Sequence, residues 1–123
     1  MPPLMFGTIK NKLGETLDYT FHEGSANCRD LLIIGHGVTG NKDRPFVVAL
    51  ADAVSASGIN VIRFSFAGNG DSDGQFRDCT ISKEVDDLQA VLSVVEEKNY
   101  RAIYAGHSMG GAVGVLAAAK DSR

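Results

Sequence analysis

The sequence predicts an α/β fold with a mostly parallel β-sheet, preceded by an N-terminal antiparallel hairpin. Short apolar runs alternate with amphipathic segments of helical period, and a glycine cluster follows each run. The composition is that of an ordinary globular protein, with 44% hydrophobic and 22% charged residues. A chain of 123 residues is close to the usual size of one domain, so we expect residues 1–123 to form a single domain.

The expected parallel strands are the three apolar runs, at residues 31–34, 61–66 and 102–105. Each run is nearly continuous in apolar residues, which is typical of strands buried on both faces of a parallel sheet. The clusters that follow them are Gly35, Gly37 and Gly40; Gly68, Gly70 and Gly74; and Gly106, Gly110 and Gly111. Glycine permits tight and left-handed turns, so the clusters indicate sharp turns after the strands.

The remaining elements follow from the spacing of apolar residues and from the positions of proline and glycine. Residues 4–10 and 15–21 alternate loosely around a turn at 11–14, which indicates the hairpin. A first helix is expected from near Pro45 to near Gly58. Its buried face is predicted to hold Phe46, Val47, Leu50, Ala51 and Val54.

A second helix is expected after Thr80, a suitable N-cap residue, and a third from about Met109 to Lys120. The apolar face of the second helix is predicted to hold Ile81, Val85, Leu88, Leu92 and Val95. Its opposite side is predicted to hold Glu84, Asp86, Asp87 and Glu96.

Charge and cysteine content exclude several classes of function. Twelve basic against fifteen acidic residues give a net charge of −3, so no nucleic-acid partner is expected. Cys28 and Cys79 are too few for a disulfide scaffold and lack metal-ligand spacing, so we expect reduced thiols, no metal and no cofactor. No signal-peptide pattern opens the chain, and its longest apolar or glycine run, residues 110–119, is too short for a membrane span. We therefore expect a cytoplasmic protein.

The sharpest motif is Gly106-His107-Ser108-Met109-Gly110, a G-x-S-x-G sequence between a predicted strand and a predicted helix. A serine on such a turn is raised above the sheet, and the glycines two positions away prevent clashes with neighbouring chain. The helix N-terminus adds a positive dipole at the same place. The setting predicts that Ser108 is a catalytic nucleophile.

A second motif, His36-Gly37-Val38-Thr39-Gly40, directly follows the first parallel strand. Acyl transfer needs two backbone N–H groups directed at the developing oxyanion. We expect one from Met109, the residue after the nucleophile, and the other from Val38. Gly37 would let this loop approach the substrate closely.

Three other features need interpretation: a second glycine motif, the three histidines and two aspartates. Residues 35–40 also match the dinucleotide fingerprint G-x-G-x-x-G, which would make Gly35, Gly37 and Gly40 part of an NAD(P)-binding half-domain. Against this, residues 41–44 separate the last glycine from the helix, and the next strand does not end in an acid. Structural roles are expected for His22, His36 and His107, and turn-forming roles for Asp71 and Asp73.

Three segments together resemble the α/β-hydrolase superfamily, especially cinnamoyl/feruloyl esterases, monoacylglycerol lipases and serine-aminopeptidase-like hydrolases. They are residues 36–43, 63–72 and 106–111, and they span most of the chain. The resemblance implies Ser108 as nucleophile and the N–H groups of Val38 and Met109 as the oxyanion hole. Ser65 is a departure, since relatives often carry an aspartate before the glycine-rich turn.

Members of this superfamily carry their acid and histidine after the nucleophile, and only fifteen residues follow Ser108. We therefore expect the N-terminal part of a serine hydrolase, acting on a small-molecule ester or related acyl substrate, with the fold cut short after the helix that follows Ser108. The chain alone is expected to be nearly inactive and to self-associate through an uncovered sheet edge. A non-catalytic fragment completed by a partner chain is the remaining alternative.

Overall fold

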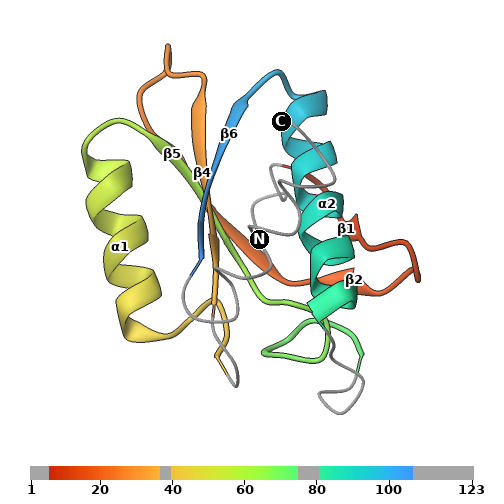
Figure 1. Cartoon of the computed structure of the whole chain (residues 1–123). Coiled ribbons are helices and arrows are strands. Elements are labelled where there is room, and N and C mark those ends of the chain that lie inside the picture. The colour runs from red at the N-terminus through yellow and green to blue at the C-terminus, as the bar shows by residue number, and fades with distance from the viewer. Residues whose placement is uncertain (1–5, 37–39, 75–80, 107–123) are drawn as a thin grey trace.

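The computed structural model describes residues 6–36, 40–74 and 81–106, in which helices lie on both faces of a central sheet (Figure 1). The strands are β1 (Ile9–Lys10), β2 (Thr16–Leu17), β3 (Tyr19–His22), β4 (Asp30–Gly35), β5 (Asn60–Phe64) and β6 (Arg101–Gly106). The helices are α1 (Pro45–Ala56) and α2 (Ile81–Glu97). The predicted α/β fold class is confirmed.

The main sheet has the strand order β3-β5-β4-β6. Strand β4 pairs in parallel with β5 on one side and with β6 on the other, while β3 runs antiparallel to β5. The three predicted parallel strands are therefore confirmed. The central strands β4 and β5 contain fully buried residues on both faces, as their continuous apolar runs indicate.

The N-terminal hairpin is shorter than the alternation suggested. Only β1 and β2 pair with each other, in a small separate sheet. After Asp18 the chain continues into β3, which pairs with β5 instead, as Tyr19 opposite Phe64 shows. The second predicted hairpin run thus divides between two sheets, because Tyr19 and Phe21 supply apolar side chains to the main core.

Helix α1 packs on one face of the main sheet, over β5 and β3 (Figure 1). Its buried residues are Val47 and Ala51, which pack with Ile34 of β4 and Val61 of β5. The predicted face was wrong in part. Phe46 and Leu50 are 47% and 37% exposed. The inward face of α1 consists of Val47, Ala51 and the partly buried Val54, so Phe46 and Leu50, one position earlier, face outward.

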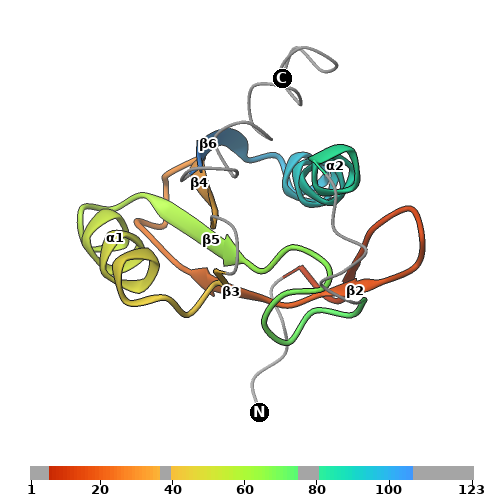
Figure 2. The same cartoon turned by 60° about the horizontal axis from the view of Figure 1, so that its bottom comes forward.

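Helix α2 lies on the opposite face of the sheet, together with β1 and β2 (Figure 2). Its apolar residues Val85, Leu88, Val91 and Val95 are buried in the larger core cluster. The prediction that Glu84 and Asp87 lie on the outer side was wrong, since they are 1% and 0% exposed. The helix is covered by the sheet and also by the hairpin, so its buried arc is wider than a single apolar stripe. Among the described residues, no helix is long and apolar enough to cross a membrane.

Candidate active site

The two chain segments that carry the predicted chemistry leave the sheet at the same level. Gly35 ends β4 and Gly106 ends β6, and the two glycines are register partners on adjacent parallel strands. Val38 follows three residues after Gly35, and Ser108 follows two residues after Gly106. The carboxyl ends of parallel strands are the usual position of binding sites in α/β proteins, so both segments start from the expected edge.

His36, the first residue after β4, is held inside the protein. It is 1% exposed, and its Nε2 accepts a hydrogen bond of 3.0 Å from the backbone N–H of Phe66, beyond the end of β5. Its ring also meets the ring of Phe66 edge-on, with centroids 5.0 Å apart. The observed contacts agree with the structural role predicted for His36 and link the β4 exit to the β5 exit.

The other end of the same loop is tied to β5 and its exit. The backbone N–H of Lys42 donates to the Ser65 hydroxyl at 3.0 Å, and the Lys42 carbonyl accepts from Arg63 Nη1 at 2.9 Å. Arg63 Nη1 also contacts a carboxylate oxygen of Asp43 at 2.6 Å. This hydrogen bond and the nearby Lys42 ammonium hold the pKa of Asp43 below its ordinary value.

The turn after β5 is fixed against the hairpin. Ser72 Oγ donates to the Ser65 carbonyl at 2.6 Å and accepts from the Asp18 N–H at 2.7 Å. The carboxylate of Asp73 accepts from the N–H of Thr16 at 2.9 Å. The Asp73 side chain thus ties the turn to β2 through a contact that is distant in sequence, and Asp71 is exposed in the same turn.

Two buried carboxyl groups of α2 were missed by the sequence analysis. Asp87 accepts from Asn11 Nδ2 at 2.8 Å and from the N–H of Ala67 at 2.9 Å, and so joins the hairpin to the β5 exit. Glu84 lies one turn earlier, and neither of its carboxyl oxygens has a hydrogen-bond partner among the described residues. Burial, with a smaller contribution from the Asp87 charge, raises the pKa of Glu84 to about 7. Burial also raises the pKa of Tyr104, with a smaller contribution from Glu84.

His22, at the end of β3, lies among charged side chains on the α1 face. Its Nε2 accepts from Arg63 Nε at 2.9 Å, and its Nδ1 lies 3.6 Å from a carboxylate oxygen of Asp52. Burial and the Arg63 charge lower the pKa of His22 below 6.5. A neutral ring is needed to accept the Arg63 hydrogen bond, so His22 serves as a fixed support for Arg63 in this arrangement.

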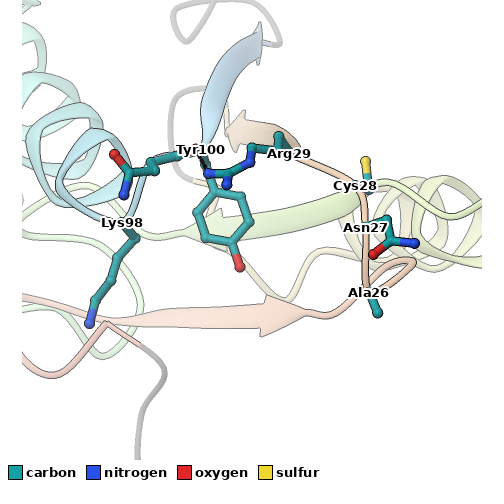
Figure 3. Close-up of a pocket in the computed structure, with 7 residues that line it drawn as sticks. Ala26, Asn27, Cys28, Arg29, Lys98 and Tyr100 are labelled. Atoms are coloured by element: carbon teal, nitrogen blue, oxygen red, sulfur yellow. Dashed lines mark hydrogen bonds between the residues drawn. The ribbon is translucent and has the colours of Figure 1, made fainter.

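A pocket of about 280 Å³ opens at the other end of the main sheet, near the starts of β4 and β6 (Figure 3). Its walls include Cys28, Arg29 and Tyr100. The Arg29 side chain reaches toward Tyr100 and donates to the Asn99 carbonyl at 3.1 Å. The length of β4 and β6 therefore separates this pocket from Gly35 and Gly106, which end those strands. The described part of the chain contains no cluster of three or more potential metal ligands among its His, Cys, Asp and Glu residues.

Several predicted site residues lie outside the described residues. They are Gly37, Val38, His107, Ser108, Met109 and Gly110, together with Thr80, Cys79 and the predicted helix at 109–120. Their proposed roles remain predictions. Gly106 ends β6, where the sequence analysis placed it. The dinucleotide interpretation is not favoured by the geometry, because α1 begins at Pro45 and not at Gly40.

The strand order, the hairpin and the helices on both faces define an α/β hydrolase, as the sequence resemblance implied. Residues 26–123 match the family model of serine aminopeptidase, S33, and the chain belongs to that family. An uncharacterized 31.7 kDa protein from the traX-finO intergenic region of Escherichia coli is 30% identical over 118 residues. That match covers 92% of this chain and 41% of the relative.

Solved structures give the same assignment. The structure of Est1E from Butyrivibrio proteoclasticus with ferulic acid bound is 31% identical, with a TM-score of 0.83, and the match covers 92% of this chain and 47% of that one. A serine hydrolase without lid from Xanthomonas campestris is 29% identical, with a TM-score of 0.78 and coverages of 92% and 54%. The chain therefore spans about half the length of these proteins and two fifths of the curated relative.

Proposed function

We propose that this chain is the nucleophile-bearing part of a serine hydrolase that cleaves a carboxylic ester or a related acyl substrate. The observation that carries the proposal is the register between Gly35 and Gly106. Because of this register, the segments that lead to Val38 and to Ser108 leave adjacent strand ends at one edge of the sheet. Membership of the serine aminopeptidase S33 family and the likeness to an esterase structure support hydrolysis as the chemistry.

In the proposed reaction, Ser108 Oγ attacks the acyl carbonyl carbon while its proton passes to a histidine base. The carbonyl electron pair moves onto oxygen, and the N–H groups of Val38 and Met109 stabilise that oxyanion. Collapse of the intermediate breaks the bond to the leaving alcohol, which takes the proton from the histidine. Water then repeats these steps on the acyl-enzyme, releases the acid and restores Ser108.

The base and its acid partner are proposed to come from polypeptide beyond residue 123. His22 and His36 are engaged by Arg63 and Phe66, and no motif assigns either to a triad. The 123-residue chain alone is therefore expected to hydrolyse esters at no more than ~10⁻⁶ of the complete enzyme's kcat, which is the size of the loss in subtilisin when its catalytic serine or histidine is removed. A small-molecule acyl substrate and a cytoplasmic location remain part of the proposal.

Fluorophosphonate labelling of the extended polypeptide tests the assignment of Ser108. The wild-type protein should be labelled at one serine, and Ser108→Ala should abolish labelling and ester hydrolysis together. Ser93→Ala is a matched control, because Ser93 is an exposed serine on α2 away from the strand ends. Labelling that persists in Ser108→Ala would contradict the proposal.

A further inference from the structure

We infer that Arg63, Ser65 and Phe66, named here the β5 clamp, fix both ends of the loop from His36 to Lys42 and so position the oxyanion donor within it. The clamp residues lie at the end of β5 and just beyond it. Three hydrogen bonds join the clamp to the loop: Lys42 N–H to the Ser65 hydroxyl, the Arg63 guanidinium to the Lys42 carbonyl, and Phe66 N–H to the His36 imidazole. The inference about catalysis rests on the proposed function; the clamp itself does not.

The first end of the loop is fixed by a hydrogen bond that is shielded from water. Phe66 donates its N–H to His36 Nε2 at 3.0 Å, and both residues are at most 1% exposed. A buried N–H that loses its partner is costly because no water replaces the lost acceptor, so this contact resists opening. It sets the direction of the chain immediately before residue 37.

The second end is fixed through the backbone of Lys42 in two directions. Its N–H donates to the Ser65 hydroxyl at 3.0 Å and its carbonyl accepts from Arg63 Nη1 at 2.9 Å. Ser65 is fully buried, and its hydroxyl is close to the turn that follows, since a Cβ on Gly70 would lie 2.7 Å from Ser65 Oγ. The serine therefore has little freedom to move away from the Lys42 N–H.

Arg63 is itself held in place by groups from two segments, β3 and the end of the loop. Its Nε donates to His22 Nε2 on β3 at 2.9 Å, and its Nη1 reaches the Asp43 carboxylate at 2.6 Å. The Arg63 side chain is 12% exposed, whereas the Asp43 side chain is 57% exposed. A planar guanidinium can satisfy several fixed acceptors at once, which a lysine ammonium cannot do in the same geometry.

The clamp gives a physical reason for Arg63 and Ser65, whose contacts with this segment are with Lys42 and Asp43 at the end of the loop. An oxyanion donor acts only if its N–H points at the developing charge, and small displacements reduce its effect. By fixing the chain on both sides of residues 37–39, the clamp would limit such displacement. Arg63 and Ser65 are therefore positioning residues and not catalytic residues.

Hydrogen exchange in the 123-residue chain tests the clamp without any need for activity. Arg63→Met should accelerate amide exchange in peptides covering residues 36–43 by threefold or more. The matched control is Arg101→Met, which removes an arginine whose Nε lies 2.6 Å from Asp30 at the far end of the sheet. An acceleration below threefold, or an equal one in Arg101→Met, overturns the inference. Exchange that rises throughout β4 in Arg63→Met would instead show that the sheet unfolds. In that case Ser65→Ala is the deciding variant, because it removes only the acceptor of the Lys42 N–H. The same threefold criterion applies to it.

Kinetics of the extended polypeptide test the consequence for catalysis. Arg63→Met and Ser65→Ala should lower kcat by tenfold or more and change KM by less than threefold, and they should weaken binding of a boronic acid that forms a tetrahedral adduct. Arg101→Met should leave all three unchanged. Loss of loop protection with an unchanged kcat overturns the catalytic consequence while Ser108 labelling still supports the proposed function. If fluorophosphonate does not label the wild-type protein, the proposed function is refuted. The clamp is then tested by the hydrogen-exchange experiment alone.

Discussion

The hydroxyl of Tyr104 on β6 lies where a side chain of Gly35 on β4 would begin. A Cβ built on Gly35 would also lie 2.8 Å from the Tyr104 ring carbon that bears the hydroxyl. Gly35 is buried and ends the central strand, one residue before His36. Glycine at this position is therefore required by the packing of β6 against β4, before any role in a loop is considered.

Gly35→Ala is expected to destabilise the chain by about 1–3 kcal/mol, the usual cost of overpacking a filled interior. Urea unfolding followed by circular dichroism measures the change. Tyr104→Phe removes the hydroxyl that the new methyl group meets, so the same Gly35→Ala change should cost less in that background. Equal costs in the two backgrounds would show that the Tyr104 hydroxyl is not the obstacle.

Glu84 predicts how stability depends on pH. Its pKa is raised from 4.5 to about 7, so the folded state keeps the proton through a range in which the unfolded state has lost it. The unfolding free energy should therefore fall as the pH rises from about 4.5 to about 7, by up to about 3 kcal/mol from this group. Burial raises the pKa of neighbouring Asp87 too, which acts in the same direction.

Glu84→Gln should flatten this dependence, as measured by urea unfolding between pH 5 and pH 8. The matched control is Asp86→Asn on the same helix, where the carboxylate pairs with Lys12 at 3.0 Å near the surface. Asp86→Asn should retain the wild-type slope. A Glu84→Gln slope equal to that of the wild type would mean that Glu84 is ionised in the folded protein across the range.

The predicted oxyanion loop can be tested at Gly37. Gly37→Val in the extended polypeptide is expected to reduce kcat by about 10²–10³, the loss seen when one oxyanion donor is removed. The expected cause is a displaced Val38 N–H, so Val38→Ala, which keeps the backbone N–H, should remain within threefold of the wild type. Full turnover by Gly37→Val would refute the role of this loop.

The alternation of apolar runs and glycine clusters was sufficient to predict the three parallel strands. The runs in β4 and β5 are buried on both faces, so their pattern depends little on which neighbour covers them. The helix faces were harder to predict. Phe46 and Val47 are adjacent apolar residues, and only the position of the sheet decides that Val47 packs inward.

The buried acids and the β5 clamp depend on contacts that are distant in sequence. Asp87 is stable inside because Asn11, 76 residues away, and the Ala67 N–H both donate to it. One signal was present: Glu84 stands four residues before Leu88 and seven before Val91, on the apolar face of the helix. Arg63 carried no such signal, since an arginine within a strand has no partner until the fold supplies Lys42 and Asp43.

Strand β6 provides the last prediction, because among the described strands it pairs only with β4. Its other edge therefore presents backbone N–H and C=O groups to no described strand, and such edges pair readily with other chains. Ile103 in the middle of β6 is 48% exposed, which adds apolar area beside that edge. We expect the 123-residue chain to self-associate through β6 and to elute as dimers or larger species at micromolar concentration.

Ile103→Lys should shift this equilibrium toward monomer by tenfold or more in dissociation constant, as measured by size exclusion with light scattering. A lysine on an edge strand is unfavourable to further pairing because its charge would be brought toward a second copy and away from water. Leu13→Lys is the matched control, since Leu13 is 65% exposed but lies in the turn between β1 and β2. If Leu13→Lys dissociates the assembly as well as Ile103→Lys does, association arises from general apolar exposure. A wild-type chain that is monomeric and unfolds cooperatively would show that β6 needs no partner strand, because the cover that α2 gives to Tyr104 and Ala102 suffices to hold it.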